Sequence, residues 1–257
     1  MAGVQERCLV RFNAIRCWEA TDVNDPMIPA ARRVYEETLA PDERIPWKWI
    51  EKSIGGAGQA NSRRRHLLLA APEGSDDDPN ALAGYAYGSF ISGYGGYLCY
   101  VGVADRARRM GVGTHLFDAF FRQMAADAKT AGESLPFVVW ESHRPGPDAP
   151  PADQEVWKAR VRLFDRVGGM WVEGVDFLSP NFAAEEGEPV ALQVFIKPID
   201  IPAVSFDEAR VRTVVEQLHQ RIYRNGPGED LFDGTFPPGC RPRLVHARLA
   251  GAALMRV

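Results

Sequence analysis

The sequence predicts an α/β fold: a mixed, mostly antiparallel central sheet flanked by helices, with a C-terminal helical appendage. Residues 8–103 begin with one strand pattern and two helix patterns. Apolar strand runs follow, and the last two are linked by a glycine-rich turn, which is typical of an antiparallel meander. Residues 97–199 alternate between buried strand patterns and one-sided helix patterns, which indicates a mixed sheet covered by helices. Beyond a proline-marked boundary, the remaining residues carry a further helical stripe.

The composition is that of an ordinary globular protein. The chain has 257 residues, of which 46% are hydrophobic and 25% are charged. Its net charge of −4 argues against a dedicated nucleic-acid binder, because such proteins depend on neutralising phosphates. The N-terminus lacks a signal-peptide pattern, and no apolar run approaches the roughly 20 residues of a membrane span. We therefore expect a cytoplasmic protein without a nucleic-acid or membrane partner.

The four cysteines are scattered without metal-ligand spacing, so we expect free thiols and no metal site. Pro198 and Pro202 mark a boundary between a first domain, residues 1–200, and an extension, residues 201–257.

The elements of the first half follow from periodicity and from turn residues. Helices are predicted where apolar residues recur at helical spacing, and strands where short apolar or aromatic runs lie between turns. The predicted order is a strand at Cys8–Trp18, helices at Met27–Thr38 and Pro46–Ile54, and strands at His66–Ala71, Leu82–Ile91 and Tyr97–Val103. The glycine-rich segment 92–96 suits a hairpin turn.

The second half predicts helices and strands in alternation. The predicted order is a helix at Val112–Lys129, a strand at Pro136–Trp140, a helix at Asp153–Val167, and strands at Met170–Phe177 and Ala191–Ile199. In the extension, Ser205 and Glu208 have capping-box spacing, which predicts a helix over about 206–224. The final apolar stretch, Leu244–Val257, predicts a strand or a helix. The extension could be a dimer arm, a lid over a substrate site, or an addition to the core.

The segment after the strand Tyr97–Val103 is the most informative one for function. A loop with Arg106, Arg108 and Arg109 leads through Gly111 and Gly113 directly into a helix. Glycine lets a ligand approach the backbone, and a helix start offers unpaired amides and the positive end of its dipole. The loop therefore indicates a pyrophosphate site. The alternative is a tight strand-to-helix turn with solvated arginines.

The residues Arg108-Arg-Met-Gly111-Val-Gly113 resemble the Arg/Gln-x-x-Gly-x-Gly/Ala signature of the Gcn5-related N-acetyltransferases, the GNAT family. The predicted element order from residue 8 to about 199 is also similar to that family. The resemblance implies a central sheet splayed at the cofactor strand. It also implies acetyl-CoA or another short-chain acyl-CoA as cofactor, and direct acyl transfer to a primary amine on a small molecule or a protein.

The resemblance also implies positions for the cofactor. It places the pantetheine on Val101, Gly102 and Val103, and the pyrophosphate on Arg108, Arg109, Met110, Gly111, Val112, Gly113 and Thr114. Arg63, Arg64 and Arg65 either meet the 3′-phosphate of the cofactor or belong to a solvated loop.

Glu141 is the candidate general base, because it follows the strand that comes after the cofactor helix. The alternative is an exposed carboxylate at a strand end. His143 is a second candidate base, and the alternative for it is an exposed loop histidine. The family often carries a tyrosine on the next helix that protonates the departing thiolate, and here that position is Phe164. Tyr100, Ser142 or water is then the candidate proton donor, and the backbone amide around Val101 is the oxyanion donor.

Two questions stay open at the level of sequence. The aromatic residues Trp47, Trp49, Tyr94 and Tyr97 either line the acceptor pocket or belong to the core. The function itself has an alternative: a non-catalytic acyl-CoA-binding or protein-interaction module that keeps the fold. Phe164 and the residues after 199 motivate that alternative, together with a homodimer formed through the extension.

Overall fold

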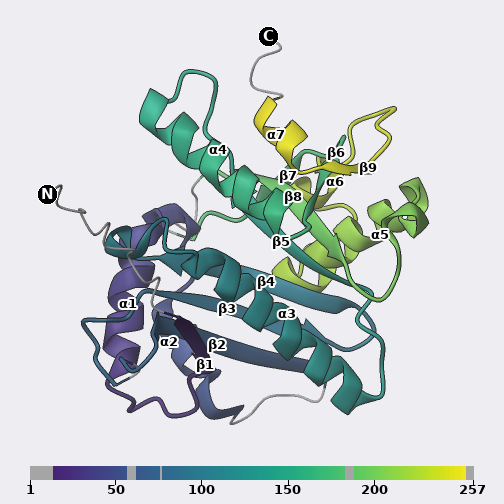
Figure 1. The fold of residues 1–257 in the computed structure, drawn as a ribbon. Helices are drawn as coiled ribbons and strands as arrows, with labels where there is room; N and C mark the ends of the chain where they lie inside the picture. The colour runs from purple at the N-terminus through teal and green to yellow at the C-terminus, as the bar shows by residue number, and fades with distance from the viewer. Residues whose placement is uncertain (1–13, 57–61, 76, 183–187, 253–257) are drawn as a thin grey trace, which may run out of the picture.

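The computed structural model describes residues 14–56, 62–75, 77–182 and 188–252. In this part of the chain a large sheet forms the centre of the molecule, with strand order β1-β2-β3-β4-β5-β8-β6-β9 and with β7 paired to β8 (Figure 1). The strands are β1 Ile15–Glu19, β2 Arg63–Pro72, β3 Gly84–Ile91, β4 Gly95–Val103, β5 Phe137–His143, β6 Met170–Glu173, β7 Phe177–Ser179, β8 Val190–Pro198 and β9 Arg243–His246. All pairings are antiparallel except that of β4 with β5, which confirms the predicted mostly antiparallel sheet.

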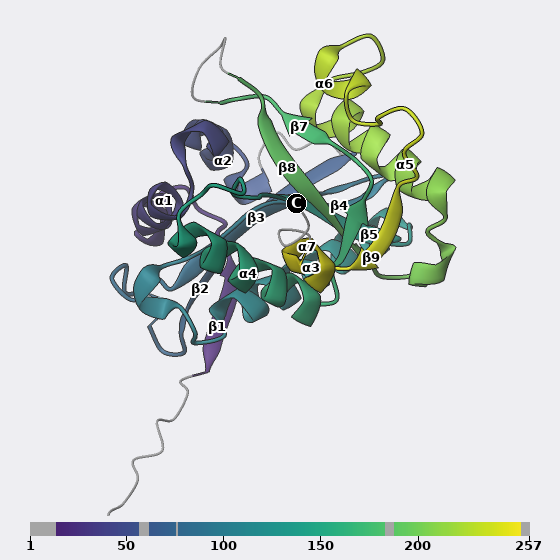
Figure 2. The same cartoon turned by 90° about the horizontal axis from the view of Figure 1, so that it is seen from above.

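Helices cover both faces of the sheet. They are α1 Met27–Thr38, α2 Trp47–Glu51, α3 Val112–Ala131, α4 Pro151–Arg166, α5 Glu208–Leu218, α6 Asp230–Asp233 and α7 Arg248–Ala252. Tyr85 on β3 packs edge-on against Tyr35 of α1. Gly88, three residues further along β3, faces Phe120 of α3, because a Cβ atom at this glycine would contact the Phe120 ring. Since neighbouring positions in a strand alternate between faces, α1 and α3 lie on opposite sides. Figure 2 shows α1 and α2 at one end of the sheet and α5 and α6 at the other.

The sheet splays between β4 and β5. These two strands pair in parallel only over Gly96–Leu98, opposite Val138–Trp140. A bulge shifts the register of β4 against β3 after Leu98, so that Cys99 has no partner on β3. From Tyr100 to Val103, β4 is again paired to β3, and from Cys99 onward no described strand pairs with its other edge. Backbone donors and acceptors on that edge therefore face the gap between the two strands.

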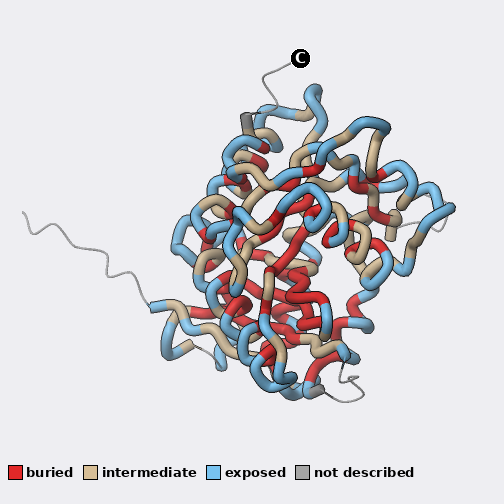
Figure 3. Tube along the Cα trace, turned by 90° about the vertical axis from the view of Figure 1, so that its right-hand side faces the viewer, coloured by how far each residue is buried: buried red, intermediate tan, exposed pale blue. Residues whose placement is uncertain are grey.

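Two apolar cores hold the layers together, and buried residues follow the strands through the centre of the molecule (Figure 3). On the α3 side, Trp140 of β5 and Phe195 of β8 stack, with ring centroids 6.0 Å apart, and Phe164 of α4 lies 4.8 Å from Phe195. On the other side, Phe137 and Val139 of β5 pack against α5 in the second core. The extension therefore shares a core with the sheet.

The extension also adds a strand to the sheet, because β9 pairs with β6 over Arg243–His246. Its helix α5 begins two residues later than the capping box predicts. Asp207, not Ser205, is the N-cap residue, and its carboxylate accepts a hydrogen bond of 2.9 Å from the amide of Arg210. After Leu218, the chain continues as a π-helical turn, His219–Tyr223.

Other predicted elements differ in length. The predicted strand Met170–Phe177 is split into β6 and β7 at Gly174, whose φ of 86° breaks the extended backbone. The predicted helix Pro46–Ile54 is shorter, and β2 begins at Arg63 instead of His66. The start of the predicted strand Cys8–Trp18 and the end of the stretch Leu244–Val257 lie outside the described residues. Of the described helices, none is both long enough and apolar enough to cross a membrane.

Candidate active site

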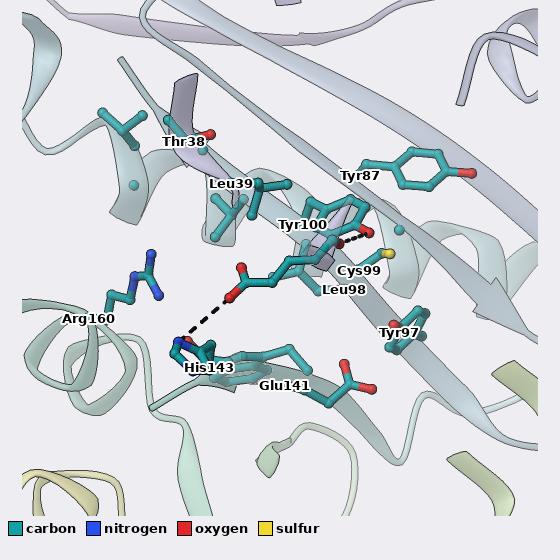
Figure 4. A pocket seen from close by; sticks show the side chains of 18 of the residues that line it. Thr38, Leu39, Tyr87, Tyr97, Leu98, Cys99, Tyr100, Glu141, His143 and Arg160 are labelled. Atoms are coloured by element: carbon teal, nitrogen blue, oxygen red, sulfur yellow. Dashed lines mark hydrogen bonds and ion pairs between the residues drawn. The ribbon is translucent and has the colours of Figure 1, made fainter. Parts of the chain in front are cut away.

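A cavity of about 1320 Å³ opens at the splay between β4 and β5. It extends from the start of α3, past the free edge of β4, to the face of the sheet between α2 and the π turn. Figure 4 shows Tyr97, Cys99 and Tyr100 of β4 around this cavity, with Glu141 and His143 of β5 across from them. We refer to the part at the start of α3 as the donor end and to the part next to α2 and β2 as the acceptor end.

The donor end contains every residue predicted for the cofactor except Met110: Val101, Gly102, Val103, Arg108, Arg109, Gly111, Val112, Gly113 and Thr114 line the cavity. Gly111 is the N-cap residue of α3 and has a φ of 81°, and Arg109 has a φ of 69°. Positive φ at these positions turns the chain sharply into α3, whose first amides have no partner within the helix. The amides at the start of α3 and the free edge of β4 are the groups that could hold a pyrophosphate and a pantetheine amide chain.

Gly113 has a role that the sequence pattern does not reveal. A Cβ atom there would lie 2.9 Å from Cδ2 of Leu163, so glycine lets α4 pack closely on α3. Met110, by contrast, is 36% exposed.

The arginines of the loop after β4 differ in their surroundings. Arg106 donates hydrogen bonds to the carbonyl oxygens of Asn80 (2.8 Å) and Leu82 (2.5 Å), so its side chain holds the loop together. This corrects the expectation that Arg106 contributes to a basic phosphate site. Arg108 forms an exposed ion pair of 2.8 Å with Asp105 and remains at the donor end.

Arg63, Arg64 and Arg65 belong to β2 instead of a loop. They pair with Ser89–Ile91, whereas Val103 and the following loop lie at the other end of β3, opposite Gly84. Five strand residues, or about 17 Å, separate Gly84 from Ser89. The arginines are therefore too far from the start of α3 to bind a pyrophosphate there. Their place in β2 corrects the alternative that they belong to a solvated loop.

Glu141 lines the cavity and is partly buried on β5. Burial raises the pKa of its carboxyl to about 7, although hydrogen bonds from the Tyr223 and Tyr97 side chains lower it in part. Tyr223 Oη donates to Glu141 Oε1 at 3.0 Å. Burial and the charge of Glu141 raise the pKa of Tyr223 well above its usual value, so this phenol stays protonated and acts as a donor.

A second carboxylate faces the same cavity. Glu43, in the turn Pro41–Glu43 between α1 and α2, lies 3.7 Å from Nδ1 of His143, and Figure 4 shows Arg160 near this pair. Burial raises the pKa of Glu43, and the charges of His143 and Arg160 oppose that shift. The His143 side chain is 44% exposed at the end of β5.

The hydroxyl of Tyr100 is engaged by backbone groups. It donates to the carbonyl oxygen of Glu43 at 2.7 Å and accepts from the amide of Ile45 at 3.0 Å. Burial raises its pKa far above the usual value. These contacts fix the turn that carries Glu43, which points to a positioning role for Tyr100.

The aromatic residues of uncertain role divide between core and cavity. Trp47 is buried against Tyr35, with ring centroids 5.3 Å apart, whereas Trp49 is 49% exposed and lines the cavity. Tyr97 also lines the cavity. Tyr94 does not, because its hydroxyl is buried and donates to the carbonyl oxygen of Val214 in α5.

The described residues include no group of three or more His, Cys, Asp or Glu side chains that could hold a metal ion. The described cysteines, Cys17, Cys99 and Cys240, form no disulfide.

Comparison with known families now adds to this geometry. The family model described as "Acetyltransferase (GNAT) family" matches residues 24–135, which include β4, the loop and α3. Within residues 24–135 the chain therefore matches a GNAT-family acetyltransferase domain. Acetyl-CoA is the acyl donor of this family, and the amides and the strand edge at the donor end fit its phosphates and amide chain. Comparison with curated proteins gives no match.

The fold is supported by one of the following solved structures, the one with a TM-score of 0.53. A protein described as a GNAT-family acetyltransferase, from Bacteroides thetaiotaomicron, has a TM-score of 0.53 and 15% identity, with 81% of this chain and 98% of that chain covered. The ribosomal-protein-S18-alanine N-acetyltransferase of Escherichia coli has a TM-score of 0.44 and 16% identity, covering 74% and 95%. A phosphinothricin acetyltransferase of Sinorhizobium meliloti, solved in complex with acetyl-CoA, has a TM-score of 0.45 and 15% identity, covering 72% and 88%.

Sequence reasoning about the GNAT domain missed two residues of the cavity, Glu43 and Tyr223. Glu43 sits in a short turn without a recognisable motif. Tyr223 is 82 positions from Glu141 in the sequence, and only the docking of the extension brings the two together. Tyr223 is the single tyrosine of residues 201–257, and no motif around it signals this contact.

Proposed function

We propose that the protein transfers the acetyl group of acetyl-CoA directly to a primary amine, in a ternary complex, with Glu141 as the general base. The observation that carries this proposal is the position of Glu141. It is a carboxylate with a pKa near 7, in the cavity between the two splayed strands. A general base works best when its pKa is close to the operating pH.

The donor end supplies the binding groups for the cofactor. We assign the phosphates to the amides of Gly111–Thr114 at the start of α3, with Arg108 and Arg109 beside them. We assign the pantetheine to the free edge of β4 at Val101–Val103, where it would add to the sheet as a strand does. When bound, acetyl-CoA supplies an acetyl thioester, which is an activated acyl donor.

The acceptor amine enters the proposal as an ammonium group, since a free amine has a pKa near 10. Glu141 attracts this cation into the cavity and takes its proton, which leaves the nitrogen lone pair free to attack. Tyr223 and Tyr97 hold the carboxylate in place by hydrogen bonds. These bonds also keep the pKa of Glu141 from rising further, so that a useful fraction is ionised at neutral pH.

No side chain of the chain needs to protonate the departing thiolate, because a free thiol has a pKa near 8.5. Phe164, at the position where the family often has a tyrosine, is 4% exposed and packs among Trp140 and Phe195. The Tyr100 hydroxyl already forms hydrogen bonds with the backbone of Glu43 and Ile45. We therefore assign the thiolate proton to water, and a positioning role to Tyr100.

The test is to incubate the protein with acetyl-CoA and a panel of primary amines, and to follow CoA release. We expect release with at least one amine, and its loss in Glu141→Gln while CoA binding by calorimetry is unchanged. Binding of CoA without turnover on any amine would support the alternative, a non-catalytic acyl-CoA-binding module. Absence of CoA binding would rule out both.

A further inference from the structure

The acceptor end of the cavity is lined by cationic side chains. Lys52, Arg63 and Arg65 all contribute to its wall. Arg63 and Arg65 are next-but-one neighbours on β2, so their side chains leave the same face of the sheet. Arg64, between them, leaves the opposite face, where it lies 3.7 Å from Asp127 of α3.

The register of the sheet puts these arginines on the same face as Glu141. Arg65 lies opposite Ser89, Ser89 opposite Tyr97, and Tyr97 opposite Val139. Residues opposite one another in neighbouring strands share a face, and Glu141 is two residues beyond Val139 on β5. One side of the sheet therefore carries cations on β2 and the candidate base on β5, with the cavity above both.

The charges of Glu141 and Arg63 both act on the thiol of Cys99. The pKa of this thiol is raised to about 12, mainly by burial and then by the charge of Glu141, whereas the charge of Arg63 acts to lower it. The thiol therefore lies within the electrostatic reach of a carboxylate on one side and of a guanidinium on the other. Cys99 and Glu141 both line the cavity (Figure 4).

Among the residues that the structure describes, Arg63 has a hydrogen-bond partner but no carboxylate partner. Its Nε donates to Oγ of Ser89 at 3.3 Å, and in the described part of the chain no carboxylate lies within 4.0 Å of it. Burial lowers the pKa of Arg63, and the charge of Arg65 lowers it further. A partly buried guanidinium beside a second one is costly to keep charged unless an anion joins it.

We propose that Arg63 and Arg65 bind a carboxylate of the acceptor, so that the substrate is a small molecule with a primary amine at one end and a carboxylate at the other. A guanidinium fork matches a carboxylate with two parallel hydrogen bonds, which gives both affinity and orientation. Three strand spacings, about 14 Å in total, separate β2 from β5 where the strands pair, and the splay and the register of Arg63 add to this separation at Glu141. The amine at Glu141 and the carboxylate at Arg63 must therefore be several bonds apart. This inference rests on the proposed function.

The experiment compares ω-amino acids with alkylamines of the same chain length that lack the carboxylate. The pairs are glycine with methylamine, 4-aminobutyrate with propylamine, and 6-aminohexanoate with pentylamine. For the two longer pairs we expect kcat/KM for the amino acid to exceed that for the alkylamine by at least about tenfold, the effect of one charge-assisted pair. In Arg63→Gln we expect KM for the amino acids to rise by a similar factor, with kcat and the alkylamine kinetics nearly unchanged.

Two further variants separate recognition from folding. Arg64→Gln removes a charge from the same strand on the opposite face, and it should keep the preference for amino acids. Arg63→Lys keeps the charge but loses the fork, and it should restore part of the preference. Equal kinetics for amino acids and alkylamines in the wild type, or an equal effect of Arg63→Gln and Arg64→Gln, would overturn the inference.

A second measurement distinguishes failure of this inference from failure of the proposed function. Calorimetry of 6-aminohexanoate binding, in the presence of CoA, requires no turnover. If no amine is acetylated, the proposed function fails. Binding that is lost in Arg63→Gln and kept in Arg64→Gln then still supports the carboxylate site, and absence of binding to the wild type overturns it.

Discussion

Tyr223 donates a hydrogen bond of 3.0 Å to Glu141, and in doing so joins the C-terminal extension to the candidate base on β5. Tyr223 ends the π turn, and Arg224, directly after it, has a φ of 56°. Single π turns are often found at functional sites, because they redirect a side chain within a helix. Here the turn directs a tyrosine into the cavity. The extension is therefore part of the site that we propose for acetyl transfer.

Replacing Glu141 by Gln should lower kcat by about 10²-fold or more, because the general base is removed while the shape of the side chain is kept. In the wild type, kcat/KM should rise with pH through about 7, since Glu141 must lose its proton to act. This limb of the pH–rate profile should be absent in the variant. Glu43→Gln is the matched control. If the rise of kcat/KM near pH 7 is lost in Glu43→Gln as well, the general base would be Glu43 instead.

Replacing Tyr223 by Phe removes a hydrogen bond that lowers the pKa of Glu141. The pH–rate limb near 7 should therefore move to higher pH, and kcat at pH 7 should fall several-fold, while the plateau at high pH changes less. Tyr85→Phe is the control, because the Tyr85 hydroxyl contacts Thr38 and lies outside the cavity lining. An unshifted limb in Tyr223→Phe would show that this hydrogen bond does not tune Glu141.

Gly111 and Gly132 stand at the two ends of α3 with similar left-handed backbones, φ 81° and 72°. Alanine at either position should cost about 1 kcal/mol of stability, because L-residues adopt this conformation with strain. Only Gly111→Ala should also weaken CoA binding, since Gly111 lines the donor end of the cavity. Urea unfolding and calorimetry with CoA measure the two effects. Equal CoA affinity in both variants would argue against a pyrophosphate site at Gly111.

His66 on β2 links two carboxylates on the α3 side of the sheet. Its Nδ1 lies 2.7 Å from Glu19 and its Nε2 lies 2.6 Å from Asp127. Burial lowers the pKa of His66, but the hydrogen bonds and charges of Asp127 and Glu19 outweigh burial and raise it to about 9. A raised folded-state pKa stabilises the fold fully below the unfolded value of about 6.5, and this contribution is lost as pH rises through 9.

His66→Gln should therefore destabilise the protein by about 3 kcal/mol at pH 6, as expected when one partner of a buried charge group is removed. The difference between wild type and variant in urea unfolding should shrink between pH 6.5 and pH 9.5. Arg64→Gln removes the more exposed member of the same group, so it should lower the free energy of unfolding by less than His66→Gln does. A difference that stays constant over this pH range would mean that His66 is neutral in the folded protein.

Local patterns in the sequence determined the order of most elements and the donor end of the site. The run from Gly111 through α3 combines a glycine with positive φ, an apolar stripe and a terminating Gly132, and all of these are signals that neighbouring residues carry. Glu141 could be placed near a strand end because it directly follows a short apolar run, Pro136–Trp140. The split of β6 from β7 and the cap at Asp207 could not be foreseen, because turn residues at several nearby positions compete for each boundary.

The sequence by itself determined the GNAT-like strand–loop–helix unit at 97–131, since the strand pattern, the glycine loop and the one-sided helix pattern follow one another directly along the chain. Only the tertiary structure decided how the cavity is completed. Strand register brings Arg63 and Arg65 to the face of Glu141 and far from the loop after β4. Docking of the extension brings Tyr223 to the same carboxylate. Such contacts depend on the packing of apolar faces that lie far apart along the chain, and no short-range pattern encodes them.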